Sequence, residues 1–262
     1  MKFFKKWNEG DMQSFLLEIT ADIFTHKDAD TGQSMVDVIL DKAGAKGTGK
    51  WTSQNSMDLA VPIPTIDAAV TAREISAYKD ERIAASELYK NNTKGINLDR
   101  EKFIHQLHDA LYFATIICYA QGFALLHNAS SELDMDVPLP EVVKIWRGGC
   151  IIRSALLNDF YKVYKKNPQL QNMLLDKRIA RMIKNKEKKL RMIIKQATAS
   201  KIPIAGFSSA LAYFDAYCSS QLPTNLIQAQ RDFLALTCIS ELIKQECFIM
   251  NGNLCLNTRK KK

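Results

Sequence analysis

The stretch GAKGTGKW, residues 44–51, has the glycines and lysines of a loop that could bind a phosphate. Gly44 and Gly49 are separated by four residues and followed by Lys50, so the stretch fits the nucleotide-loop pattern G-x-x-x-x-G-K-[ST] except at its last position. Trp51 stands where that pattern requires a magnesium-binding hydroxyl. The stretch is therefore an incomplete nucleotide loop, an ordinary glycine turn or a site for another anion.

The surrounding sequence argues against a nucleotide loop. Such a loop joins a buried strand to a helix in a protein where strands and helices alternate. Residues 34–42, SMVDVILDK, instead predict a helix that stops at Gly44, and no such alternation follows. A glycine turn and a site for a phosphate or carboxylate both remain open. The anion site would use two lysine charges, one hydroxyl and backbone N–H groups exposed by glycines, at Lys46, Lys50, Thr48, Gly47 and Gly49.

A second candidate is the run from Lys177 to Lys195, which holds nine basic residues and one acid, Glu187. A basic helix of this kind can bind nucleic acid. Apolar residues nevertheless recur at helical spacing, at Ile179, Met182, Ile183, Leu190, Ile193 and Ile194. No aromatic residues lie between the basic ones, as single-strand binding would need. We therefore predict a packed helix with a solvated basic face and no nucleic-acid partner.

Neither the histidines nor the cysteines form a recognisable site. The four histidines are scattered, and Asp109 is the one carboxylate alongside His105 and His108, so no metal site is predicted. The six cysteines show no C-x-x-C pair and no zinc spacing, which favours free thiols in a cytoplasmic protein. The N-terminus carries lysines but lacks the apolar segment of a signal peptide.

The elements that would position these residues are helices. Eleven glycines and seven prolines are few for 262 residues, and no segment alternates with period two, so we predict an all-α fold. The net charge of +8 favours an anionic partner but does not choose among metabolites, nucleic acid and membranes. The predicted helices cover residues 11–24 with Asp11 as N-cap, 34–44, 64–89, 100–127, 170–200 and 225–250.

Residues 110–126 need separate treatment because all seventeen are uncharged. That length is at the lower limit for a membrane span, and the stretch contains Thr115, Gln121 and Gly122. We predict a helix buried nearly all round in a large core, and no membrane partner.

Five strings carry a specific resemblance. They are AGAKGTGKWT (43–52), YKDERIAAS (78–86), YAQGFALL (119–126), IWRGGCIIRS (145–154) and LPTNLIQAQRDF (222–233). In this order and spacing they resemble the helical C-terminal domain of 6-phosphogluconate dehydrogenase, the decarboxylating enzyme of the oxidative pentose phosphate pathway. The resemblance covers residues 7–233.

The resemblance implies both an architecture and a reaction. Family members join an N-terminal dinucleotide-binding domain to a large all-helical domain and form homodimers in which each tail threads into the partner. They oxidise 6-phosphogluconate at C3 with NADP and then decarboxylate the keto acid to ribulose 5-phosphate. A lysine acts as general base and a glutamate as general acid, without metal.

The resemblance also assigns substrate-binding residues to this sequence. The substrate lysine of the K-G-T-G-K-W motif falls on Lys46, with Thr48 as its hydroxyl neighbour. The helix arginine that holds the substrate phosphate falls on Arg73, and the tail arginine that reaches the other subunit's phosphate falls on Arg231. A guanidinium suits a phosphate because it can donate two parallel hydrogen bonds.

The sequence departs from the family pattern at both ends. It contains no G-x-G-x-x-G, and the catalytic lysine and glutamate would lie upstream of Met1, so no catalytic or coenzyme-binding residue is assigned. After residue 233 the family's aromatic–glycine–alanine–histidine run is missing, and Thr237 stands where the substrate-contacting histidine is expected. We therefore divide the chain into a family domain, residues 1–233, and a divergent tail, residues 234–262.

Two functions follow as expectations. The first is a fragment of 6-phosphogluconate dehydrogenase that carries part of the substrate site and the dimer interface and depends on a separate coenzyme domain for NADP. The alternative is a non-catalytic helical module for dimerisation or for sugar-phosphate binding.

Overall fold

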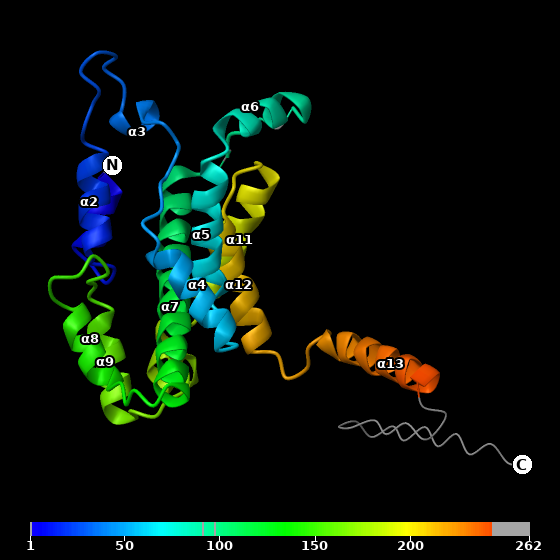
Figure 1. The fold of residues 1–262 in the computed structure, drawn as a ribbon. Coiled ribbons are helices and arrows are strands. Elements are labelled where there is room, and N and C mark those ends of the chain that lie inside the picture. Colours follow the sequence, from blue (N-terminus) through cyan, green and yellow to red (C-terminus); the bar gives the residue numbers. More distant parts are fainter. Residues whose placement is uncertain (1, 91, 97, 243–262) are drawn as a thin grey trace, which may run out of the picture. The chain divides into compact units, whose positions relative to one another are not determined.

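The computed structural model describes residues 2–90, 92–96 and 98–242, with side chains up to residue 234 (Figure 1). Over these residues it contains helices and two isolated β-bridges but no strand, which confirms the all-α prediction. The helices are α1 Lys2–Asn8, α2 Phe15–Ile23, α3 Met35–Val38, α4 Thr48–Asp58, α5 Pro64–Ser76, α6 Lys79–Leu88, α7 Arg100–Glu132, α8 Leu139–Trp146, α9 Leu157–Lys166, the 3-10 turn η1 Met173–Leu175, α10 Lys177–Ile183, α11 Lys186–Ala199, α12 Ala205–Tyr217 and α13 Thr224–Leu242.

The chain divides into two compact units, Met1–Phe214 and Asp215–Lys262. The first unit contains α1 to α11 and most of α12, and the second contains the end of α12 and α13. Most of the divergent tail predicted from the sequence, residues 243–262, lies outside the described residues. The division at residue 233 therefore stays a prediction.

The core of the first unit is built around α7. None of residues 110–126 is exposed, which confirms that this uncharged stretch is a helix buried nearly all round. Phe123 is fully buried, and its ring lies 5.0 Å from that of Tyr164 and 5.0 Å from that of Trp146. Among the described helices, α7 alone is long and apolar enough to cross a membrane. Of its apolar 18-residue stretch, 56% is buried inside the protein.

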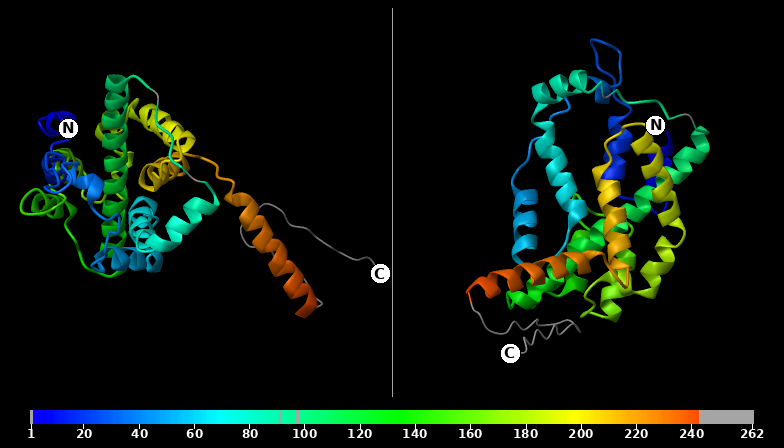
Figure 2. Two further views of the ribbon diagram at one scale, coloured as in Figure 1. Left: turned by 90° about the horizontal axis from the view of Figure 1, so that it is seen from above. Right: turned by 90° about the vertical axis from the view of Figure 1, so that its right-hand side faces the viewer.

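Helices α11 and α5 pack against α7 (Figures 1 and 2). From α11, the buried side chains Leu190 and Ile193 join the core, and from α12 the ring of Phe214 meets Phe113 edge-on at 5.0 Å. Removing such apolar surface from water is the main favourable contribution to folding. The first unit thus has a core of its own.

The helix predicted for residues 34–44 is wrong beyond its first turn. Helix α3 ends at Val38, and Ile39 is already extended. The backbone beyond it bonds to other helices, because the N–H of Ala43 donates to the Ser76 hydroxyl at 2.9 Å. Tertiary contacts here replace the hydrogen bonds of a helix.

Two predicted long helices are each interrupted. The helix predicted for 64–89 breaks after Ser76, whose hydroxyl donates to the carbonyl of Arg73 and so competes with the helical bonds. The helix predicted for 170–200 begins only at Lys177, after the 3-10 turn η1 and the extended Asp176. It also breaks at Asn185, which has a φ of 66°, a left-handed conformation that asparagine tolerates. The N-cap predicted at Asp11 is also wrong, because Ser14 caps α2 by accepting from the N–H of Leu17.

Candidate functional site

Helix α4 begins within the glycine stretch, residues 44–51. Gly47 has a φ of 94°, which L-residues with a side chain rarely adopt, and α4 begins at the next residue, Thr48. The N–H of Trp51 donates to the carbonyl of Gly47 at 3.0 Å. Gly49 allows α4 to lie against α5, because a Cβ there would be only 3.0 Å from Cγ2 of Val70. Each of these two glycines therefore has its own structural requirement.

Residues 39–47, hereafter the glycine segment, are fastened to the end of α5. The guanidinium of Arg73 donates to the carbonyl of Gly44, and the hydroxyl of Ser76 accepts from the N–H of Ala43 at 2.9 Å. Arg73, which the sequence predicts as a phosphate ligand, thus lies beside the segment that carries Lys46. Its side chain is exposed and retains further donors for an anion.

A carboxylate fastens the same segment to α6. Asp41 pairs with Lys79 at 2.6 Å and with Arg82 at 3.0 Å. No motif in the sequence assigns a role to Asp41, Ser76, Lys79 or Arg82. The spacing of Lys79 and Arg82 by three residues, which places both on one helix face, was the available signal.

Lys46 and Thr48 lie on the surface at the start of α4, and both are exposed. The first N–H groups of a helix lack partners within the helix, and together with the helix dipole they favour a negative charge. Lys46 adds a full positive charge to this end of α4, and Thr48 adds a hydroxyl. The structure thus brings Lys46, Thr48 and Arg73 to one surface where a phosphate or carboxylate could bind.

A buried glutamine holds the start of α5. Gln121 of α7 is fully buried, its Oε1 accepts from the N–H of Thr65 at 2.9 Å, and its Nε2 donates to the Thr65 hydroxyl at 2.9 Å. These bonds satisfy groups that the first turn of α5 would leave unpaired. The position of α5, and with it Arg73, is therefore fixed from inside the core. A polar residue within an apolar run was the sequence signal.

Arg231 belongs to the second unit. It is exposed on α13, within the turn that a hydrogen bond of 2.8 Å between Gln228 and Asp232 spans. The structure describes this unit by itself, so the role predicted for Arg231 remains a prediction. The side chain of Thr237 lies outside the described residues.

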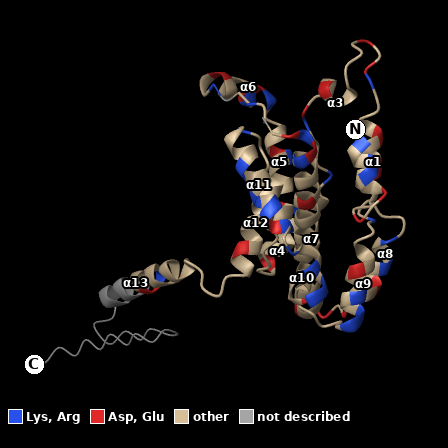
Figure 3. Cartoon of the chain, turned by 180° about the vertical axis from the view of Figure 1, so that it is seen from behind, with Lys and Arg blue, Asp and Glu red and all other residues tan. Residues whose placement is uncertain are grey.

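The basic run 177–195 forms α10 and α11, where Figure 3 colours the Lys and Arg positions blue. The apolar positions of these helices pack on the core. Part of its charge is neutralised by the protein itself. Arg178 pairs with Asp159 at 2.7 Å, and Lys186 pairs with Asp109 at 2.7 Å. Burial alone would raise the pKa of Asp109, but the bond from Lys186 brings it below the usual value. These pairs agree with a solvated face on packed helices.

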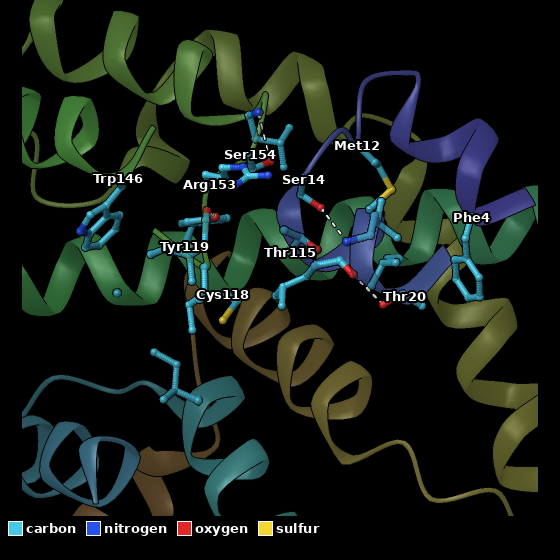
Figure 4. A pocket seen from close by; sticks show the side chains of 18 residues that line it. Phe4, Met12, Ser14, Thr20, Thr115, Cys118, Tyr119, Trp146, Arg153 and Ser154 are labelled. Atoms are coloured by element: carbon cyan, nitrogen blue, oxygen red, sulfur yellow. Dashed lines mark hydrogen bonds between the residues drawn. The ribbon is translucent and has the colours of Figure 1, made fainter. Parts of the chain in front are cut away.

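A cavity of about 650 Å³ opens beside α7, between α2 and the loop that follows α8 (Figure 4). Its lining is mostly apolar, with Thr115, Cys118 and Tyr119 pointing in from α7 and Arg153 from the loop. The Tyr119 hydroxyl donates to the carbonyl of Ile152 and so ties this loop to α7. Burial raises the pKa of both Tyr119 and Cys118, so neither group is activated as a nucleophile or acid.

Over the described residues the chain is thus all-α, with a candidate anion site at the start of α4. The family model for the C-terminal domain of 6-phosphogluconate dehydrogenase matches residues 1–248. The chain belongs to this family.

The relatives agree with this assignment. The chain is 49% identical over 231 residues to the NADP(+)-dependent, decarboxylating 6-phosphogluconate dehydrogenase of Bacillus subtilis, covering 88% of this chain and 49% of that protein. It is 43% identical over 245 residues to the decarboxylating enzyme of Escherichia coli K12, covering 94% and 52%. A solved structure of Plasmodium falciparum 6-phosphogluconate dehydrogenase, studied apo, with its cofactor NADP+ and with its substrate, superposes with a TM-score of 0.84 at 46% identity, covering 88% and 50%. The chain therefore spans about half the length of the relatives that it matches.

Proposed function

We propose that this chain supplies part of the substrate site of a 6-phosphogluconate dehydrogenase. The observation that carries the proposal is the junction of the glycine segment, α4 and α5. There Arg73 contacts Gly44, two residues before Lys46, and Thr48 is the first residue of α4, in a chain that belongs to the family. The reaction of the complete enzyme is the NADP-dependent oxidative decarboxylation of 6-phosphogluconate to ribulose 5-phosphate.

Each residue has a separate task in this proposal. Arg73 binds the phosphate of the substrate, because a guanidinium can donate to two phosphate oxygens at once. Lys46 and Thr48 bind oxygens of the sugar acid through a charge and a hydroxyl. Arg231 reaches the phosphate in the partner subunit of a cytoplasmic homodimer. None of the four is assigned a proton transfer, which in the family a lysine and a glutamate perform.

The described residues do not fit NADP itself. Dinucleotide binding of the family type needs a parallel sheet with a glycine-rich turn. The described part of the chain contains no strand, and the whole sequence contains no G-x-G-x-x-G. We therefore assign NADP to a coenzyme domain outside the described residues, and we assign no step of hydride transfer to the described residues.

A coupled assay tests whether this chain alone catalyses the reaction. The purified chain, with 6-phosphogluconate and NADP, is expected to form no NADPH. Turnover by the chain alone would show that the catalytic groups are present in it.

Calorimetric titration with 6-phosphogluconate tests the site. We expect binding that is weakened but still measurable in Lys46→Ala and in Arg73→Ala. Two matched controls, Lys188→Ala and Arg181→Ala, remove exposed basic residues of α11 and α10, and Arg181 also donates to a backbone carbonyl. Equal binding by all variants would remove the proposed site.

A second candidate is a non-catalytic dimerisation module, favoured by the apolar cavity between α2 and α7. Leu16 lines this cavity and is 52% exposed, so the chain offers apolar surface that a second copy could cover. This candidate predicts a dimer whose formation Leu16→Arg prevents, as measured by sedimentation. Leu175→Arg, at an exposed leucine of η1, is the matched control. A chain that remains monomeric at high concentration would exclude it.

A further inference from the structure

The glycine segment has few apolar contacts to hold it in place. Ile39 and Leu40 are 59% and 62% exposed, and Lys42 to Lys46 are all exposed. A segment without buried apolar side chains opens locally at low cost. Its position must therefore depend on the polar contacts that it makes with α5 and α6.

Asp41 makes the most of these contacts. Its carboxylate accepts from Lys79 at 2.6 Å and from Arg82 at 3.0 Å, and its backbone carbonyl accepts from Arg82 at 3.3 Å. The same guanidinium group donates to the carbonyl of Ser76 at 3.3 Å, at the end of α5. Arg82 therefore joins the glycine segment, α5 and α6 at one point.

The electrostatics agree with this geometry. The hydrogen bonds from Arg82 and then from Lys79 lower the pKa of Asp41 to about 2. The carboxylate is thus charged throughout the neutral range, and both cations remain paired with it.

We propose that Asp41 is a positioning residue for the substrate site. Through Lys79 and Arg82 it holds the glycine segment against α5 and α6, and thereby fixes Lys46 and the start of α4. Lys46 lies five residues beyond Asp41, on the same short segment. The effect on substrate rests on the proposed function, whereas the effect on the segment does not.

Hydrogen–deuterium exchange of the full chain tests the effect on the segment. In Asp41→Asn we expect amides of residues 41–47 to exchange roughly 3- to 10-fold faster, since surface ion pairs are individually weak. Exchange in α7 is expected to stay unchanged, and Asp41→Glu to keep most of the protection.

The matched control is Glu141→Gln. It breaks the Glu141–Lys144 pair of 2.7 Å on α8, whose partners are 53% and 41% exposed, close to the exposure of the Asp41 pair. We expect no change in the glycine segment. Unchanged protection in Asp41→Asn, or the same change in Glu141→Gln, overturns the proposal.

A double-mutant cycle tests whether Asp41 acts through Lys46. Asp41→Asn is expected to weaken binding of 6-phosphogluconate roughly 3- to 10-fold, and to have little further effect in Lys46→Ala, because residues that act through one another are not additive. A purely structural role would give the same factor in both backgrounds, and that result would overturn the positioning role.

The two proposals fail in different ways. If Lys46→Ala binds 6-phosphogluconate like the unmodified chain, or if neither binds, the proposed function fails, and exchange alone decides whether Asp41 orders the segment. If Lys46→Ala weakens binding but Asp41→Asn does not, the site stands and the positioning role fails.

Discussion

Helix α7 and the glycine segment are held in place by different forces. Residues 110–126 of α7 include no exposed position, and their rings pack against α8, α9 and α12. The glycine segment exposes Ile39 and Leu40 and is tied to its neighbours by hydrogen bonds and ion pairs. Burial of apolar surface supplies most of the stability of a protein, whereas exposed ion pairs supply little.

The difference separates stability from binding. The first unit can keep its fold through α7 while the glycine segment changes its position. The proposed substrate-binding residues lie mainly at or near the glycine segment, where exposed polar groups can bind a ligand. Substitutions near α7 should therefore change the free energy of unfolding, and substitutions near the segment should change binding.

The largest effect is expected for Phe123→Ala. The side chain is fully buried among aromatic rings, and its removal leaves a cavity, so the free energy of unfolding should fall by ~3–5 kcal/mol. Trp51→Ala, at a ring that is 62% exposed beside the glycine segment, should change it by less than ~0.5 kcal/mol. Urea unfolding measures both, and equal losses would contradict the comparison.

A smaller loss is expected for Gln121→Met, which keeps the size of the side chain but removes both bonds to Thr65. The N–H and hydroxyl of Thr65 would be left unpaired in a buried site, at a cost of ~1–3 kcal/mol. Thr65→Val removes only the hydroxyl and should cost less. If Gln121→Met unfolds at the same urea concentration as the unmodified chain, the bonds do not anchor α5.

The sequence predicted the α7 side well for a physical reason. An uncharged run of this length has few alternatives to a buried helix, and the periodicity of 177–195 likewise predicted its packed face. Residues 34–44, which include most of the glycine segment, were predicted as a helix because the sequence continues a helical pattern up to Gly44. That prediction failed since the contacts that decide the conformation come from Ser76 and Arg82, more than thirty residues away.

The candidate site was predictable in part. The resemblance identified Lys46, Thr48 and Arg73, and in the structure Arg73 contacts Gly44, two residues before Lys46, while Thr48 begins α4. The residues that hold this arrangement, Asp41 and Gln121, carry no motif of their own. Their roles depend on pairings across the fold, which spacing along the chain cannot reveal.

A smaller effect on the free energy of unfolding is expected for Gly49→Ala, and it should depend on the residue at position 70. Alanine favours a helix over glycine by about 1 kcal/mol, but its Cβ would lie only 3.0 Å from Cγ2 of Val70. The two effects should nearly cancel in the free energy of unfolding. In a Val70→Ala background the clash is gone, and Gly49→Ala should then stabilise the chain. Destabilisation in both backgrounds would show that Gly49 serves another purpose.

The smallest effect is the pH dependence of the contribution that Asp41 makes to the free energy of unfolding. Because its folded-state pKa is lowered from 3.8 to about 2, Asp41 stabilises the folded chain fully above pH 4, and this contribution is lost as the pH falls from 3.8 to about 2. The difference in unfolding free energy between the unmodified chain and Asp41→Asn should therefore be constant near neutral pH and shrink over that interval. Salt should reduce it as well, because the carboxylate is 55% exposed and its pairs are screened. A difference that is independent of both pH and salt would mean that the asparagine acts through packing, and that the glycine segment is not held by charge.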